Sequence, residues 1–222
     1  FPGVSYAGGI SEEITLLRGD DSVRISPDWA FPENFFVLAT MNSVDKAALP
    51  LDSALTRRFH RVSVPPNMTQ LARDLDLSVS ELTAEASAVR SGGDWSQMSV
   101  EVTAYLLLER LNFAIATDLS PDFELGQGLL WPLVQAEESD RWDALIEVWD
   151  HSIMPQLIER FGGRGDTLRD VLKIDGGASA GSVLAMRALL GTQTSGEGEL
   201  DLPMLSSVSD SEARATLRWL AV

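Results

Sequence analysis

Short apolar runs alternate with turn-forming residues over residues 1–66, a pattern that predicts strands and short helices. Ser11 can cap a helix that ends at Gly19-Asp20-Asp21, with acidic residues in its first turn. Residues 22–25 and 61–64 predict short strands. The run Phe35-Phe36-Val37-Leu38-Ala39 is continuously apolar, which is typical of a strand buried on both faces of a parallel sheet.

From Met68 onward the apolar positions recur with helical period. The predicted helices are 68–76, 78–90, 99–118, 128–137, 139–161, 166–173, 181–190 and 209–221. In the clearest of them, the apolar stripe contains Val102, Leu106, Leu107, Phe113 and Ile115. Glycine-rich stretches predict loops or linkers at 91–94, 176–181 and 191–198.

These patterns divide the chain into three parts. We predict the C-terminal part of an α/β core in 1–66, an all-α domain in 67–190, and a linker with a C-terminal helix in 191–222. The fold class is therefore the end of a parallel α/β sheet followed by a helical domain, and the chain is mostly helical.

The composition narrows the functional classes. With 17 basic and 33 acidic residues the net charge is −16, which disfavours a direct grip on nucleic acid or on an anionic membrane. The absence of cysteine excludes disulfides and thiolate chemistry, and the two histidines, His60 and His151, lie far apart in the sequence. A metal site built on these residues is not expected.

Polar residues follow the apolar run at 35–39. Asn42 would place a neutral amide at the carboxyl edge of a sheet, where ligands bind in open α/β folds. A short helix predicted over 51–59 presents Arg57 and Arg58 near its end, and guanidinium groups bind phosphate oxygens through a planar fork. Asn42 is also a common turn former, and arginines also stabilise a helix end, so these structural interpretations stay open.

This stretch resembles the sensor 1 and arginine-finger segments of AAA+ P-loop NTPases, and within them the McrB-type restriction motors. The matching segments are Met41-Asn42-Ser43-Val44-Asp45-Lys46 and Ala54-Leu55-Thr56-Arg57-Arg58-Phe59. Two helical stretches are similar to the McrB lid: Leu125-Gly126-Gln127-Gly128-Leu129-Leu130-Trp131-Pro132 and Ile153-Met154-Pro155-Gln156-Leu157-Ile158-Glu159-Arg160-Phe161.

The resemblance implies a role for each matching residue. Asn42 would be sensor 1 and hold the attacking water near the terminal phosphate. Arg57 or Arg58 would be the finger that reaches the nucleotide of a neighbouring subunit, an interaction typically worth about 10³–10⁵ in rate.

Other matching positions are weaker candidates for nucleotide contacts, namely Asp45, Lys46 and Gly126. Asp45 fits a turn equally well, and Lys46 replaces an arginine of the family pattern and lacks its bidentate fork. Gly126 and Gly128 also fit a backbone with positive φ.

The expected cofactor is ATP or GTP with Mg²⁺, bound mainly through residues outside this sequence. A P-loop needs G-x-x-x-x-G-K-[ST], and neither of the two lysines, Lys46 and Lys173, follows a glycine. An apolar strand ending in Asp-Glu is also missing from the sequence. We expect both motifs to lie before Phe1 in a longer polypeptide.

The resemblance further implies a cytoplasmic homo-oligomeric ring, commonly a hexamer, that couples nucleotide hydrolysis to DNA translocation and activates a McrC-like nuclease subunit. DNA would be bound only through the full-length assembly, and no membrane partner is expected. Two alternatives remain: a non-hydrolysing AAA+ scaffold, which Lys46 and Gln127 permit, and a MoxR-like chaperone ATPase.

Overall fold

The computed structural model describes residues 14–18, 21–25, 34–40, 57–60, 62–91, 94–177, 182–184 and 202–222. The chain divides into two compact units, Phe1–Ser43 and Val44–Val222. The domain boundaries predicted near residues 66 and 190 stay predictions.

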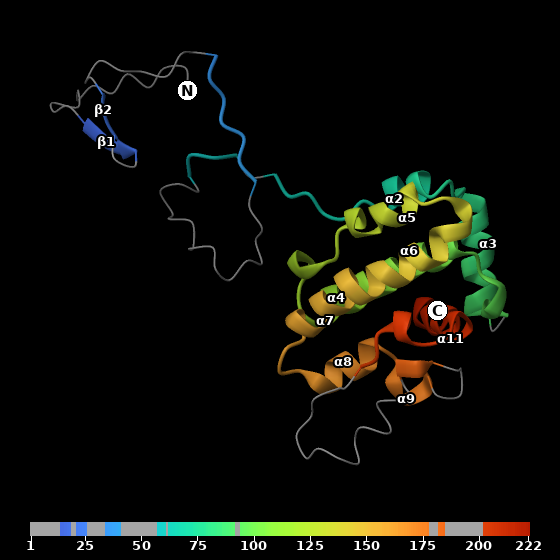
Figure 1. The fold of residues 1–222 in the computed structure, drawn as a ribbon. Helices are drawn as coiled ribbons and strands as arrows, with labels where there is room; N and C mark the ends of the chain where they lie inside the picture. The colour runs from blue at the N-terminus through green and yellow to red at the C-terminus, as the bar shows by residue number, and fades with distance from the viewer. Residues whose placement is uncertain are drawn as a thin grey trace. The chain divides into compact units, whose positions relative to one another are not determined.

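The first unit contains an antiparallel pair of strands, β1 (Ile14–Arg18) and β2 (Asp21–Ile25) (Figure 1). The strand predicted at 22–25 is confirmed, whereas the helix predicted from Ser11 is wrong over the described residues of β1. The register explains why: it pairs Ile14 with Ile25 and Leu16 with Val23, so apolar positions of period two meet across the ladder. Arg18 pairs with Asp21, which leaves a two-residue connection typical of a hairpin.

The other strands predicted from apolar runs are not formed. Residues 35–40 have no strand structure, and Phe36 and Leu38 are 87% and 96% exposed. Residues 62–64 likewise form no strand, and Val62 and Val64 are exposed. A parallel strand requires hydrogen-bonded neighbours, and none pairs with these runs among the described residues. The predicted parallel sheet therefore has no counterpart in the described part of the chain.

The second unit is helical, and most of the predicted helices are confirmed. Its α-helices are α2 (Met68–Asp74), α3 (Val79–Arg90), α4 (Val100–Asp118), α5 (Trp131–Gln135), α6 (Arg141–Val148), α7 (Met154–Arg160), α8 (Gly165–Val171), α9 (Ile174–Gly177) and α11 (Asp210–Ala221). Its shorter elements are the 3-10 helices η1 (Trp95–Gln97), η2 (Pro121–Phe123), η3 (Gln127–Leu130), η4 (Glu138–Asp140) and η7 (Leu205–Ser207), and the π-helix η5 (Trp149–Ile153).

Side-chain caps fix several of the helix starts. Ser78 and Ser209 each form a capping box with the glutamate three residues later, and Ser99 accepts a hydrogen bond from the backbone N–H of Val102. The helix predicted over 139–161 is realised as α6, η5 and α7 in succession. Of the helix predicted over 181–190, only 182–184 are described, and α9 extends into the predicted loop at 176–181.

The long helix α4 forms the centre of the hydrophobic core. Helices α2, α3, α6, α8 and α11 all contact it, and Figure 1 shows α6 running alongside it. The core is made of large side chains that are almost completely buried, among them Leu107, Leu108, Leu111, Ile115, Leu125, Leu130, Leu133, Leu145, Trp149, Ile153 and Phe161. An ion pair of 2.7 Å between Arg141 and Glu101 also ties α6 to α4.

One position of the predicted stripe on α4 is not buried. Val102, Leu106, Leu107 and Ile115 lie in the core, but Phe113 is 75% exposed. Phe113 lies seven residues after Leu106, so both point to the same side of the helix. Leu106 and Phe113 both line an open pocket on this side of α4, and Phe113 is exposed there.

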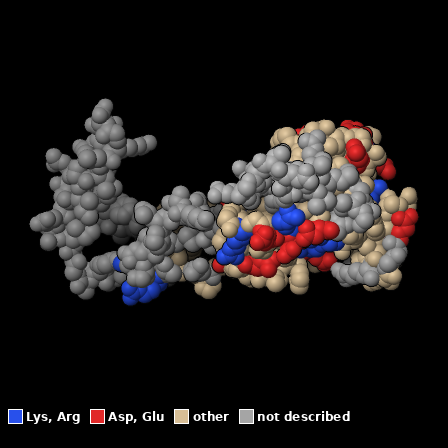
Figure 2. Space-filling view, turned by 90° about the horizontal axis from the view of Figure 1, so that it is seen from below, with Lys and Arg blue, Asp and Glu red and all other residues tan. Residues whose placement is uncertain are grey.

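Charges of both signs lie close together on the helical unit. Figure 2 shows acidic side chains on one face, interrupted by basic ones. Arg141 of α6 pairs with Glu101 of α4, and Arg214 pairs with Asp210 within α11. Within the described residues drawn on that face, there is no continuous basic surface of the kind that grips a phosphate backbone.

Candidate functional site

The predicted sensor residue Asn42 lies outside the described residues, as do Asp45 and Lys46. Their roles in nucleotide binding therefore stay predictions.

The two candidate finger arginines are described. Arg57 and Arg58 form a turn, and both are exposed. The helix predicted over 51–59 is a turn and bend at residues 57–59, while 51–56 lie outside the described residues. An exposed arginine is able to reach a phosphate on another molecule, and the finger role of Arg57 or Arg58 stays a prediction.

Gly126 lies at the start of η3 and is exposed. Its φ is −70°, and a Cβ at Gly126 or Gly128 would meet no atom within 4 Å. Neither glycine adopts a positive φ, so that interpretation is wrong for both. A negative φ is accessible to any residue, so the backbone conformation here does not require glycine, and a nucleotide contact by Gly126 stays a prediction.

The stretch that contains Gly126 is instead held from inside the domain. Asn112 of α4 donates its Nδ2–H to the carbonyl of Leu125 at 2.9 Å, and its Oδ1 accepts the N–H of Leu125 at 2.6 Å. Both residues are buried. At the next turn, the Oε1 of Gln127 accepts the backbone N–H of Asn67 at 3.0 Å, which joins η3 to the start of α2.

Asn112 was missed by the sequence analysis, although a signal existed. It is a polar residue between Leu111 and Phe113 in an otherwise apolar part of α4. A buried amide must find partners for both of its ends, and the two backbone groups of Leu125 provide them.

Asp150 is a second buried polar residue that the sequence analysis missed. It lies in the π-helix η5 and is 6% exposed. Its two carboxylate oxygens accept the backbone N–H groups of Leu205 and Ser206, at 2.7 and 2.8 Å. The available signal was weak: Asp150 directly follows Val148-Trp149, but Glu147, His151 and Ser152 nearby are polar as well. π-Helical turns recur at functional positions in other proteins.

Two cations meet the last turn of α11. Arg110 of α4 donates its Nε–H to the carbonyl of Leu220, and Lys173 donates to the carbonyl of Trp219 at 3.3 Å. The Lys173 ammonium also lies 4.5 Å from the centre of the Trp219 ring. Burial lowers the pKa of Arg110 to about 10, and burial followed by the charge of Arg110 lowers the pKa of Lys173 to about 8.

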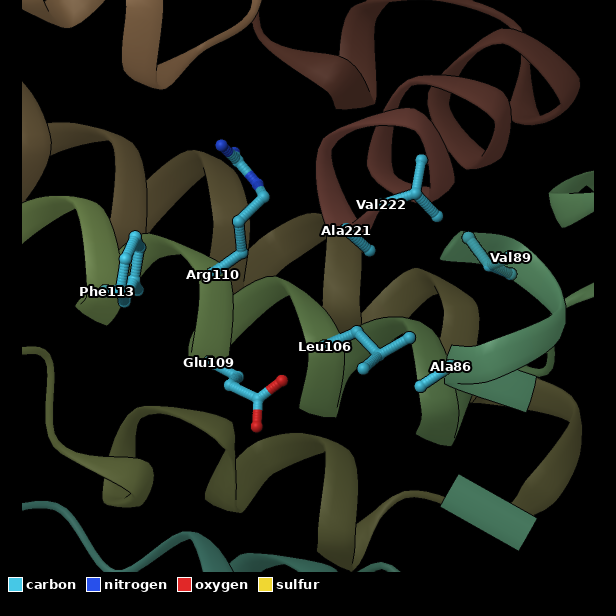
Figure 3. A pocket seen from close by; sticks show the side chains of 8 residues that line it. All are labelled: Ala86, Val89, Leu106, Glu109, Arg110, Phe113, Ala221 and Val222. Carbon is cyan, nitrogen blue, oxygen red and sulfur yellow. The ribbon is translucent and has the colours of Figure 1, made fainter. Parts of the chain in front are cut away.

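A pocket of about 450 Å³ opens between α3, α4 and the end of α11 (Figure 3). Its lining is mostly apolar and consists of Ala86, Val89, Leu106, Glu109, Arg110, Phe113, Ala221 and Val222. Figure 3 shows Arg110 extending toward α11, while the carboxylate of Glu109 points to the opposite side of α4. Arg57, Arg58 and Gly126, the described residues that are predicted to bind nucleotide, do not line this pocket.

No cluster of three or more potential metal-ligating side chains occurs among the described residues. In the same part of the chain, no helix combines the length and apolar character needed to cross a bilayer.

The fold and these contacts define a helical domain built around α4 and closed by α11. Residues 104–169 match the family model described as McrB, alpha-helical lid domain. The match covers just under a third of the chain and includes both stretches that resemble the McrB lid in sequence, so the resemblance to McrB is confirmed there. It also includes Asn112 and Asp150, whereas Arg57 and Arg58 lie before it. Among curated proteins no significant match is found.

Proposed function

We propose that this chain supplies the sensor 1, arginine-finger and lid portion of an AAA+ NTPase resembling the McrB motor. The observation that carries the proposal is the match of residues 104–169 to the McrB lid domain. Such a domain works beside a P-loop core, and the motif with Asn42, Arg57 and Arg58 precedes it at the position where that core would end.

The proposed chemistry is phosphoryl transfer from ATP or GTP to water. Asn42 orients the attacking water, and Arg57 or Arg58 stabilises the charge that develops on the transferred phosphoryl group of a neighbouring subunit. Mg²⁺ and most of the nucleotide would be held by residues outside this sequence. Because the finger acts between subunits, hydrolysis would depend on assembly into a ring, for which a hexamer is our proposal.

In this proposal the ring drives DNA translocation and activates a McrC-like nuclease subunit. DNA contact is assigned to the full-length assembly, since the chain carries a net charge of −16. The cytoplasm is the proposed location.

A non-hydrolysing AAA+ scaffold is the second candidate, and one contact favours it. The family pattern has a histidine where this chain has Gln127, and the Gln127 carbonyl oxygen accepts the N–H of Asn67. This oxygen is therefore occupied within the domain, which weakens a role in binding nucleotide.

The test uses the full-length protein with Arg57→Ala and Arg58→Ala made separately. We expect one of them to lower ATP or GTP turnover by about 10³-fold or more while ring assembly, measured by sedimentation, is unchanged. Arg73→Ala, which removes another exposed arginine, is the matched control. Parental turnover in both assembled variants would rule out the finger assignment. A parent that assembles without any hydrolysis would support the scaffold.

A further inference from the structure

The pocket at the end of α11 combines an apolar lining with one cation. Its volume of about 450 Å³ lies within the range of about 300–1,000 Å³ that is usual for sites of small organic ligands. Such sites are mostly apolar and contain a few polar groups that fix the orientation of the ligand. The lining has this composition, because it is apolar apart from Glu109 and Arg110 (Figure 3).

The apolar part of the lining is surface that the fold leaves accessible. Phe113 is 75% exposed although it lies on the central helix of the core, and Ala86 and Val89 of α3 are only partly buried. Removal of apolar surface from water is favourable in proportion to its area. An apolar ligand that covers these side chains would therefore be stabilised.

The cation of the lining has no acidic partner. Arg110 donates its Nε–H to the carbonyl of Leu220, but its Nη2 is buried and has no hydrogen-bond partner. No carboxylate of the described residues forms an ion pair with Arg110. Lys173 adds a second positive charge, which is close enough to Arg110 for the two to repel each other. A buried charge is costly unless an opposite charge accompanies it, so an anion beside Arg110 would be stabilised.

Glu109 does not supply that opposite charge. Figure 3 shows its carboxylate on the side of α4 opposite to the guanidinium of Arg110. The electrostatic preference of the pocket wall next to α11 is therefore set by Arg110, and it is a preference for a negative group.

We propose that this pocket binds a small apolar monocarboxylate of the medium-chain fatty acid class. The alkyl chain lies along Leu106, Val89 and Phe113, and the carboxylate pairs with the guanidinium of Arg110, a combination that gives strong, charge-assisted hydrogen bonds. The net charge of −16 disfavours anions on the chain as a whole, so the affinity for a carboxylate has to come from Arg110 and Lys173. The proposal does not depend on nucleotide hydrolysis.

The test measures binding to the full chain by isothermal titration calorimetry with three probes. Octanoate carries both the alkyl chain and the charge, octanol carries the chain without the charge, and acetate carries the charge without the chain. We expect octanoate to bind about tenfold or more tightly than octanol, and acetate not to bind.

Two variants assign the binding to this pocket. Arg110→Met should weaken octanoate binding by about tenfold to a hundredfold and leave octanol binding unchanged. Arg164→Met is the matched control, because Arg164 also donates to a carbonyl at a helix end, that of Asp118, but at an exposed position outside the pocket. Ala86→Phe keeps the cation and fills the pocket from α3, so it should weaken the binding of both octanoate and octanol.

Three results would overturn the proposal. They are the absence of octanoate binding to the parent, equal affinity of the parent for octanoate and octanol, and octanoate binding that Ala86→Phe leaves unchanged. Circular dichroism shows whether each variant is folded. If Arg110→Met does not fold, the comparison of octanoate with octanol in the parent and the effect of Ala86→Phe still decide the outcome.

Discussion

Replacing Asn112 tests how the lid segment at residues 125–132 is positioned. Asn112→Ala leaves the N–H and the carbonyl of Leu125 without partners in the interior, where Leu125 is completely buried. An unsatisfied buried polar group costs about 1–3 kcal/mol, so the pair predicts a loss of about 2–5 kcal/mol in the free energy of unfolding. For a chain of this size the melting temperature should fall by about 5–15 °C.

The assay is urea unfolding followed by the fluorescence of the tryptophans, among which Trp149 is fully buried. Thr117→Ala on the same helix is the matched control, because it also removes a side-chain hydrogen bond to a backbone carbonyl, at an exposed position. The control should stay within about 0.5 kcal/mol of the parent.

Asn112→Asp makes the prediction more specific. The carboxylate can accept the N–H of Leu125, but it cannot donate to the carbonyl unless it is protonated. Protonation would be favoured in the folded state, so the folded pKa would be raised and stability would be lost as pH rises. The deficit relative to the parent should therefore shrink between pH 7 and pH 4.5. A deficit that is independent of pH, or a loss below about 0.5 kcal/mol in Asn112→Ala, would refute the pairing with Leu125.

Two further predictions concern other contacts of the helical unit. Burial and then the charge of Arg110 lower the pKa of Lys173 to about 8 in the folded chain. Between this folded pKa and the ordinary pKa of lysine, the unfolded chain binds more protons than the folded chain, so the free energy of unfolding rises with pH. Lys173→Met should remove this rise, which is limited to about 1 kcal/mol because solvent screens the half-buried ammonium group. The urea midpoints of parent and variant are compared from about pH 7.5 to 9.5, and midpoints that change in parallel with pH would contradict the assignment. Ser99→Ala should cost about 1 kcal/mol in thermal unfolding by removing the cap of α4, whereas Ser99→Asn should cost little because asparagine also caps; equal losses would show that the cap contributes nothing.

The helical part of the fold could be predicted because its signals are local. Apolar residues at helical spacing and capping serines mark the starts and ends of α3, α4 and α11, and these depend only on neighbours a few residues away. The strands failed for the opposite reason. The apolar run at 35–39 predicts a buried strand, but in the structure it forms no strand and its side chains are exposed. Burial and strand pairing depend on other segments, which the residues of the run do not specify.

The same distinction applies to the candidate site. Arg57 and Arg58 could be selected from the sequence because their residue types and spacing carry the motif, and the structure adds that both are exposed. Asn112 and Asp150 could be noticed as polar residues next to large apolar ones, but their partners could not be predicted, because these lie 13 and 55 residues away in the chain. No local pattern encodes such distances.

By itself, the sequence determined a cysteine-free, acidic chain with a helical domain and a resemblance to the McrB lid, since composition, periodicity and short motifs are properties of neighbouring residues. The tertiary structure decided which polar residues are buried and what they bind. It showed that the glycines at 126 and 128 are not conformationally required, and that an amide fixes the lid segment. It also brought α11 onto α4, with a carboxylate at the start of η7 and two cations at the last turn of α11. These features follow from long-range packing, which places groups together only after the chain has folded.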